Sequence, residues 1–129
     1  MQITATVVFI KNRKVLLEKR RKDEDNYAGL WALPGGHKRK KETIRQALKR
    51  EIREELKVTI KKAKYLGMFR DIDPTSKNLY HHHAFLVKDW GGKITKTYEQ
   101  KGLKWCDPKK LPKNTGSVDR KILKQRDFL

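Results

Sequence analysis

The segment spanning residues 42–56 has the periodicity of a helix and is the feature that most restricts how this chain can fold. At about 100° per residue, one arc of that helix collects apolar side chains, namely Ile44, Ala47, Leu48, Ile52 and Leu56. Basic side chains occupy the opposite arc. Glu51, Glu54 and Glu55 break this order, because they project from the C-terminal end of the apolar arc and its edge. The pattern predicts a core-packed helix with carboxylates gathered at one end of its buried face.

Carboxylates in these positions are energetically costly. Like charges one helical turn apart repel, and the C-terminal end of a helix disfavours negative charge. Burying an unpaired carboxylate costs several kcal/mol. A divalent cation relieves this cost, and hard oxygen ligands suit Mg²⁺ or Mn²⁺. The alternative is a solvated acidic patch paired with neighbouring lysines and arginines, and spacing alone leaves both interpretations open.

The rest of the chain consists of strand-like runs, turns and a second helix. Apolar and β-branched runs predict strands over residues 3–10, 14–20, 60–69, 80–90 and 102–106. A short apolar run at 30–33 stops at Pro34, Gly35 and Gly36, which together are a strong structure breaker. The pattern of residues 118–128 predicts a short helix. Strands mixed with two helices favour an α+β fold, a mixed-sheet sandwich, in a single domain over residues 1–129.

The net charge, the single cysteine and the lengths of the apolar stretches indicate which partners and which cell compartment to expect. Lys and Arg number 33 against 15 Asp and Glu, so the net charge is +18, which attracts nucleotides, nucleic acid or acidic membrane surfaces. The single cysteine, Cys106, excludes an internal disulfide and fits a reducing cytosol. No apolar stretch approaches the roughly 18 residues of a membrane span, and no signal-peptide pattern precedes the first strand. We therefore expect a soluble, cytoplasmic protein.

The helical segment and the loop before it resemble the Nudix box, whose pattern is Gly-x5-Glu-x7-Arg-Glu-U-x-Glu-Glu-x-Gly-U, with U a bulky aliphatic residue. Within residues 36–58 the matching positions are Gly36, Glu42, Arg50, Glu51, Ile52, Glu54, Glu55 and Val58. Only Lys57 departs, because the family has glycine there. Glycine takes a left-handed conformation easily at a helix end, whereas other residues lose roughly 1 kcal/mol. The departure affects the turn rather than the chemistry.

The resemblance implies both a fold and a reaction. Nudix domains are α/β/α sandwiches with a mixed β-sheet, in which the box forms a loop–helix–loop. They cleave a diphosphate linkage in a nucleoside diphosphate attached to another group, by attack of water in the presence of a divalent metal, Mg²⁺ or Mn²⁺. The metal ligands implied here are Gly35 through its carbonyl, Glu51, Glu54 and Glu55. The implied catalytic residues are Glu54, Glu51, Arg50 and Glu99, with Arg50 orienting Glu54 four residues later.

Residues outside the box narrow the subfamily by resemblance. Residues 30–36 are similar to the lead-in of MutT-like members, which hydrolyse nucleoside triphosphates to monophosphate and pyrophosphate. Arg20 lies where such members carry a phosphate-contacting arginine, and Glu99 resembles a later acid that serves as an extra metal ligand or general base. The alternative for Arg20 is a solvated arginine in a basic loop, and the alternative for Glu99 is an acid on the surface.

Two further residues are candidates for contacting the nucleotide base. Asn114, just past Pro112, is similar to an asparagine that reads a base edge in MutT, although asparagine is also a common loop residue. Among residues 81–83, which are all histidine, His83 is the candidate for lining a base pocket. Alternate strand residues face opposite sides, so His81 and His83 share one face and His82 takes the other.

The sequence thus favours an enzyme, a MutT-like hydrolase of (d)NTPs, including oxidised ones such as 8-oxo-dGTP. Within the enzyme class, ADP-ribose, dinucleoside polyphosphates and the 5′-triphosphate end of RNA remain open as substrates. The second hypothesis is a basic nucleic-acid-binding protein on the same fold, because phosphate contacts dominate such binding. Nonspecific nucleic-acid contact is possible for either class, and the oligomeric state stays open.

Overall fold

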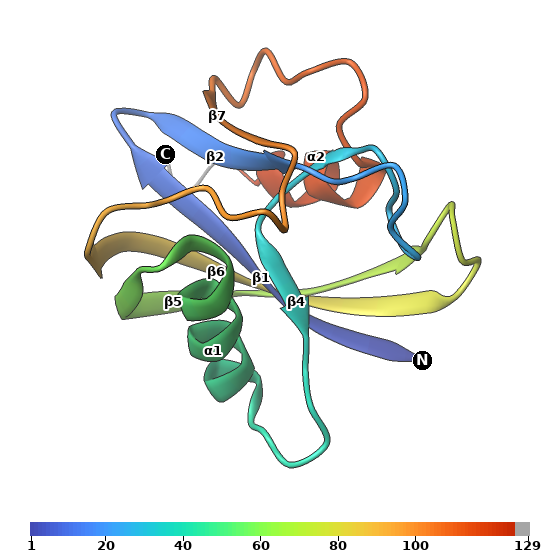
Figure 1. Cartoon of the computed structure of the whole chain (residues 1–129), viewed down its shortest axis with the longest axis horizontal. Coiled ribbons are helices and arrows are strands. Elements are labelled where there is room, and N and C mark those ends of the chain that lie inside the picture. Colours follow the sequence, from blue (N-terminus) through green and yellow to red (C-terminus); the bar gives the residue numbers. More distant parts are fainter. Residues whose placement is uncertain (126–129) are drawn as a thin grey trace.

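A computed structural model describes residues 1–125, and its elements follow the predicted order closely (Figure 1). The strands are β1 (Gln2–Lys11), β2 (Lys14–Lys19), β3 (Trp31–Ala32), β4 (Gly35–His37), β5 (Thr59–Ile72), β6 (Leu79–Gly91) and β7 (Gly102–Cys106). The helices are α1 (Ile44–Leu56) and α2 (Ser117–Leu123). Within the described residues, no helix is both long and apolar enough to cross a membrane.

The sheet is mixed, with β1 at its centre. β1 runs parallel to β6, in a register that joins Gln2 to Tyr80 and Phe9 to Val87. It is antiparallel to both β2 and β4. β5 is antiparallel to β6 at one edge, and β3 and β7 each pair antiparallel with β2. This arrangement confirms the predicted α+β, mixed-sheet fold.

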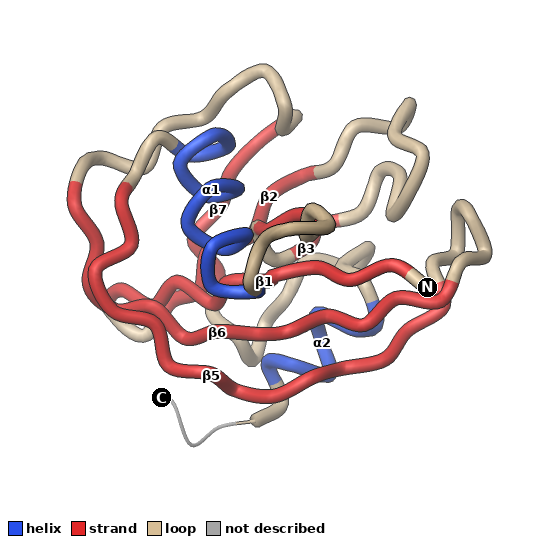
Figure 2. The backbone as a smooth tube through the Cα atoms, turned by 90° about the horizontal axis from the view of Figure 1, so that it is seen from below, coloured by secondary structure: helices blue, strands red, loops and turns tan. Residues whose placement is uncertain are grey.

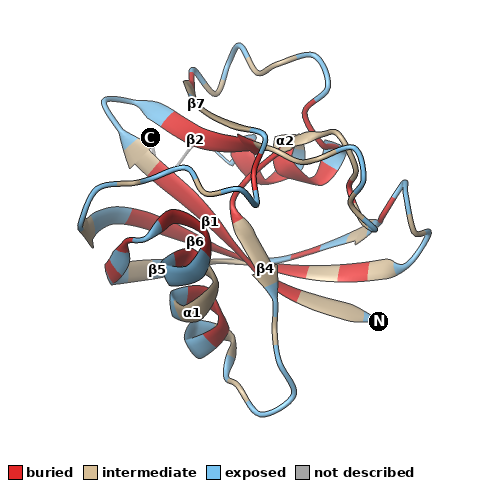
Figure 3. Cartoon of the chain, in the orientation of Figure 1, coloured by how far each residue is buried: buried red, intermediate tan, exposed pale blue. Residues whose placement is uncertain are grey.

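Each face of the sheet carries its own apolar core. Successive residues of β1 alternate between the two faces, so Val7 and Phe9 pack with α1 whereas Val8 packs with α2. α1 contributes the apolar arc predicted from its periodicity, and Ile52 and Leu56 are fully buried. Figure 2 shows the two helices on opposite sides of the strands, and Figure 3 shows the buried residues between them. The sheet therefore lies between two helical layers.

Both ends of α1 are fixed by local hydrogen bonds. Thr43 is the N-cap, where its Oγ1 accepts from the Gln46 backbone N–H at 3.1 Å while the Gln46 Oε1 accepts from the Thr43 N–H at 2.8 Å. The helix therefore begins at Ile44 rather than at residue 42, and Glu42 lies in the loop before it. At the other end, Lys57 adopts the left-handed conformation that the family's glycine takes, with φ 63° and ψ 29°.

Two sequence predictions differ from the structure. The breaker at 34–36 overlaps β4, which pairs with β1 because Gly35 brings its backbone against that of Ala5. A Cβ on Gly35 would lie 2.1 Å from the Ala5 carbonyl oxygen, so only glycine fits this approach. The C-terminal helix, predicted over 118–128, spans Ser117–Leu123, and the part of that prediction at 126–128 lies outside the described residues.

Candidate active site

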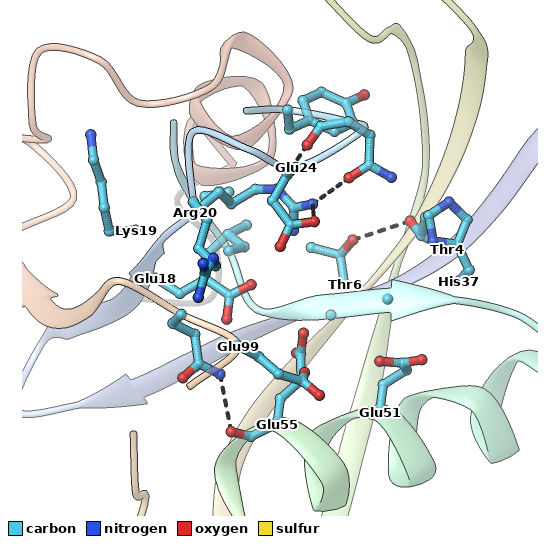
Figure 4. A pocket seen from close by; sticks show the side chains of 18 of the residues that line it. Thr4, Thr6, Glu18, Lys19, Arg20, Glu24, His37, Glu51, Glu55 and Glu99 are labelled. Atoms are coloured by element: carbon cyan, nitrogen blue, oxygen red, sulfur yellow. Dashed lines mark hydrogen bonds and ion pairs between the residues drawn. The ribbon is translucent and has the colours of Figure 1, made fainter. Parts of the chain in front are cut away.

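A cavity of about 580 Å³ opens between the C-terminal half of α1, strands β1, β2 and β4, and the loops at 20–27 and 98–100 (Figure 4). The sequence-predicted residues that line it are Arg20, Gly35, Glu51, Glu55 and Glu99. These come from four separate parts of the chain. The fold therefore brings most of the predicted site to one place.

Arg50 connects the box residues that flank the cavity. Its guanidinium donates to Glu42 through Nε at 2.6 Å and through Nη2 at 2.8 Å. Its Nη1 donates to Glu51 at 2.7 Å and to Glu54 at 3.4 Å, and its Nη2 also reaches the His37 carbonyl. The paired guanidinium holds the pKa of Glu42 down at about 2. Arg50 thus contacts both Glu51 and Glu54, and the contact with Glu51 is the shorter of the two.

Glu54 is not among the residues that line the cavity. Its side chain is 48% exposed and forms ion pairs with Arg50 at 3.4 Å and Arg39 at 3.9 Å. Glu51 is more enclosed, at 17% exposed, and packs against the Gly36 backbone. A Cβ on Gly36 would lie 2.3 Å from the Glu51 carboxylate. The box glycine therefore makes room for the carboxylate at the helix.

Three buried carboxylates face the cavity, and two of them lie outside the box. Burial raises the pKa of Glu18 to about 8 and that of Asp119 to about 7. Burial and the negative charge of Glu18 raise the pKa of Glu55 well above its usual range. Sequence reasoning passed over Glu18 and Asp119. The available signal was an acid directly after the apolar run 15–17, and an acid in the last helix.

Arg20 lines the cavity, but its guanidinium is already engaged. It donates to the Asn26 side chain and, at 3.1 Å, to the Asn26 carbonyl, and it forms an ion pair with Glu24 at 3.4 Å. A positively charged side chain at this wall is suited to phosphate. Glu99 faces the helix from the 98–100 loop, and partial burial together with Glu51 and Glu54 raises its pKa.

Two predicted base-contacting residues lie elsewhere. His83 points to the α1 side of the sheet, where its Nδ1 hydrogen-bonds to the Tyr65 hydroxyl at 2.8 Å, and it is not among the residues that line the cavity. The predicted alternation is correct, but its phase places His82 at the cavity instead. Asn114 also lies outside the cavity lining, where its Nδ2 donates to the Gly29 carbonyl at 3.3 Å.

His82 belongs to a hydrogen-bonded chain that forms one wall of the cavity. The Tyr27 hydroxyl donates to Asp71 at 2.8 Å, so its oxygen accepts from the His82 Nε2–H at 2.9 Å. The His82 Nδ1 then accepts from the Thr4 hydroxyl at 2.6 Å. Burial lowers the pKa of His82 to about 4, so the ring is neutral at physiological pH. This chain fixes the tautomer and leaves a rigid, polar wall.

The donor set of the cavity suits a hard divalent cation. Among residues 1–125, no three acidic, histidine or cysteine side chains stand close enough to form a complete metal cage. Mg²⁺, however, binds through one or two carboxylates together with water and substrate phosphate. The Glu55 Oε2 is buried and has no hydrogen-bond partner among the described residues. A buried carboxylate oxygen without a donor is the kind of ligand that such an ion requires.

A mixed sheet between two helices carries an acid-lined cavity beside a loop–helix–loop, which is the arrangement that the resemblance to the Nudix box implies. A family model described as the NUDIX domain matches residues 1–125. The chain therefore belongs to the Nudix family of pyrophosphohydrolases, whose members generally need a divalent metal.

Similar proteins include enzymes with different substrates. The CTP pyrophosphohydrolase of Escherichia coli (strain K12) is 33% identical over 108 residues, which cover 84% of this chain and 76% of that protein. The ADP-ribose pyrophosphatase of Methanocaldococcus jannaschii is 31% identical over 106 residues, which cover 82% of this chain and 62% of that protein. A crystal structure of a MutT NUDIX hydrolase from Burkholderia pseudomallei matches with a TM-score of 0.87 at 25% identity, covering 97% of each chain.

Proposed function

We propose that this protein is a MutT-like hydrolase that uses Mg²⁺ or Mn²⁺ to convert nucleoside triphosphates to monophosphate and pyrophosphate. The observation that carries the proposal is that two carboxylates face one cavity. Glu51 is held there by Arg50, and Glu55 presents a buried oxygen that has no hydrogen-bond partner among the described residues. Both side chains face a space of about 580 Å³, within the range of small-ligand pockets.

The residues divide the work of the reaction between them. Glu51, Glu54, Glu55 and the Gly35 carbonyl would supply the metal ligands, with one or two of the carboxylates on each ion, and the bound metal would neutralise charge on the transferring phosphates. Arg20 contacts phosphate from the opposite wall. Glu99 lines the same cavity, and we propose that its carboxylate accepts the proton of the attacking water.

The choice of a triphosphate over ADP-ribose is supported by the similarity to a CTP pyrophosphohydrolase, which covers more of that protein than the ADP-ribose match does. The deeper cavity wall carries polar groups suited to a base edge, at His82, Tyr27 and Asp119. An oxidised purine such as 8-oxo-dGTP remains within the proposed class. The proposed substrates are therefore nucleotides with a free triphosphate.

The proposal is tested by incubating the protein with Mg²⁺ and a panel that contains CTP, the dNTPs, 8-oxo-dGTP, ADP-ribose, a dinucleoside polyphosphate and 5′-triphosphate RNA. We expect pyrophosphate from at least one free triphosphate. Glu54→Gln is expected to lower kcat by about 100-fold or more, and Glu99→Gln to lower it by a similar factor if Glu99 is the base. The exposed Asp89→Asn on β6 is the control. Cleavage of ADP-ribose alone would contradict the substrate class.

Nucleic-acid contact is a second candidate activity, supported by one exposed patch beside α1. Tyr65 is 44% exposed and stacks on His83, with ring centroids 5.9 Å apart. The Arg45 guanidinium lies 5.1 Å from the Phe85 ring centroid at the same patch, and the net charge is +18. An accessible aromatic ring beside cations is suited to a stacked base of single-stranded nucleic acid.

This second candidate is tested with a labelled single-stranded oligonucleotide. We expect binding that weakens steeply with added KCl and that weakens several-fold further in Tyr65→Ala. Tyr98→Ala removes an exposed tyrosine at the cavity mouth and serves as the matched control. Equal affinities for the wild type and Tyr65→Ala would show that the patch does not bind the strand.

A further inference from the structure

Glu18 lies on β2, outside the box, and one oxygen of its buried carboxylate has no hydrogen-bond partner in the described part of the chain. Its side chain faces the cavity (Figure 4) and is only 2% exposed. Its Oε2 has no hydrogen-bond partner among residues 1–125. The strand around it is apolar, since Val15, Leu16 and Leu17 are all buried in the two cores. A buried acid without a donor is costly, so its position calls for a partner from outside the chain.

Glu55 is also a buried acid with an unpartnered carboxylate oxygen that faces the cavity. It comes from the last turn of α1 and is 8% exposed, and its Oε2 is the other buried side-chain oxygen without a partner in the described part of the chain. Its backbone carbonyl accepts from Gln100 Nε2 at 3.0 Å and from Thr97 Oγ1 at 3.1 Å, which fixes the end of the helix beside the cavity. The negative charges of Glu18 and Glu55 act on each other. Two separate elements thus present unpartnered carboxylate oxygens to the same space.

The protein supplies little positive charge to balance this pair. Arg20 is the cation whose charge most favours ionised Glu18, but its guanidinium is engaged by Asn26 and Glu24. The other large charge effects on Glu18 come from acids, namely Asp119, Glu99 and Glu24. Two outcomes remain for such a pair, because it either shares a proton or binds a cation.

We propose that Glu18 is a further metal ligand, which together with Glu55 binds a divalent cation whose remaining ligands are water and a phosphate oxygen of the substrate. This inference rests on the proposed function and extends the metal site beyond the box. Mg²⁺ typically takes one or two carboxylates from the protein and completes its shell with water and phosphate. Two carboxylates are therefore sufficient, and uptake at this position depends on pyrophosphate.

The test is a calorimetric titration of the whole chain with Mn²⁺, with and without pyrophosphate. In the presence of pyrophosphate, Glu18→Gln is expected to weaken Mn²⁺ affinity by about tenfold or more, or to abolish one binding site. Glu18→Asp keeps the charge but withdraws the oxygen by one methylene, and we expect it to restore little of the affinity. Asp119→Asn changes a buried acid of the same cavity that already has a hydrogen-bond donor, the Leu33 backbone N–H, and because pyrophosphate carries no base we expect the affinity to change by less than about threefold.

Thermal unfolding in a chelator checks that the variants are folded. Glu18→Gln is expected to unfold at the same temperature as the wild type or higher, because it removes an unpartnered buried acid. Equal Mn²⁺ affinity in the wild type and Glu18→Gln overturns the inference and points to a shared proton. Equal weakening in Glu18→Gln and Asp119→Asn, or full rescue by Glu18→Asp, also overturns it, because charge alone then explains the effect.

The outcome for the proposed function is separate. A wild type that takes up no Mn²⁺ overturns both the inference and the metal-dependent hydrolysis. A wild type that binds Mn²⁺ and cleaves triphosphate, with Glu18→Gln binding equally well, overturns only the role of Glu18.

Discussion

Arg50 binds Glu42 through two parallel hydrogen bonds, from Nε at 2.6 Å and from Nη2 at 2.8 Å. Glu42 lies before the helix and Arg50 lies two turns into it, so the pair ties the loop to the helix. The same guanidinium uses its remaining nitrogen, Nη1, for Glu51 at 2.7 Å. Glu42 therefore fixes the plane of the group that holds Glu51, the carboxylate proposed to bind metal, and we infer that Glu42 acts as a positioning residue.

Glu42→Gln is expected to lower kcat and Mn²⁺ affinity by about 10- to 100-fold while the chain stays folded, because outer partners of metal ligands typically contribute this much. Steady-state kinetics with a nucleoside triphosphate, Mn²⁺ titration and circular dichroism measure the three quantities. Asp89→Asn, an exposed acid on β6, is the control. Unchanged Mn²⁺ affinity in Glu42→Gln would show that Arg50 keeps its orientation without this partner.

Gly35 and Gly36 are adjacent but serve different purposes, and alanine separates them. A Cβ on Gly35 meets the Ala5 backbone, which cannot move aside, whereas a Cβ on Gly36 meets the flexible Glu51 side chain. Gly35→Ala is expected to lower the free energy of unfolding by at least about 2 kcal/mol. Gly36→Ala is expected to stay near wild-type stability and to lose most activity as Glu51 swings away. Urea unfolding and kinetics measure both, and the reverse pattern would contradict this division.

The sequence predicted elements well where the signal is local. The apolar arc of α1 packs as its periodicity indicated, and the box spacing located Glu51 and Glu55 at the cavity. β4 was missed because its pairing depends on the close approach of Gly35 to β1, which lies about thirty residues earlier in the chain. No local pattern reports such a long-range contact.

The site was predicted less completely, for physical reasons that the residues make plain. The alternation of His82 and His83 follows from strand geometry, but which of them faces the cavity depends on which sheet face the cavity occupies. Glu18 and Asp119 become site residues only because β2 and α2 carry them to the same cavity. Burial and partners of an acid are tertiary properties, and a single sequence contains neither.

Lys57 is the one departure from the box pattern, and its backbone conformation can be tested by substitution. Its φ of 63° is left-handed, a conformation that costs non-glycine residues roughly 1 kcal/mol. Lys57→Gly is expected to raise the free energy of unfolding by about 1 kcal/mol in urea. Lys57→Gln removes the charge but keeps the side-chain carbon and is expected to gain little. An equal gain in both variants would assign the effect to charge rather than to the backbone.

Asp119 predicts a pH dependence of stability in the metal-free protein. Burial raises the pKa of Asp119 to about 7 from an unfolded value near 3.8, so the folded chain binds the proton more tightly than the unfolded chain does. The stability from this proton is fully present below the unfolded pKa and is lost as pH rises through 7. Between pH 5 and 8.5 this loss is about 3 kcal/mol of unfolding free energy.

Asp119→Asn removes the titration and keeps an oxygen that can accept from the Leu33 backbone N–H, which Asp119 Oδ1 does at 3.0 Å. In a chelator, Asp119→Asn is expected to exceed the wild type in unfolding free energy at pH 8.5, with the advantage shrinking by about 3 kcal/mol at pH 5. Urea unfolding at several pH values measures the difference between the two proteins, in which the titration of His82 largely cancels because both proteins carry it. An advantage that is independent of pH would show that Asp119 does not hold this proton.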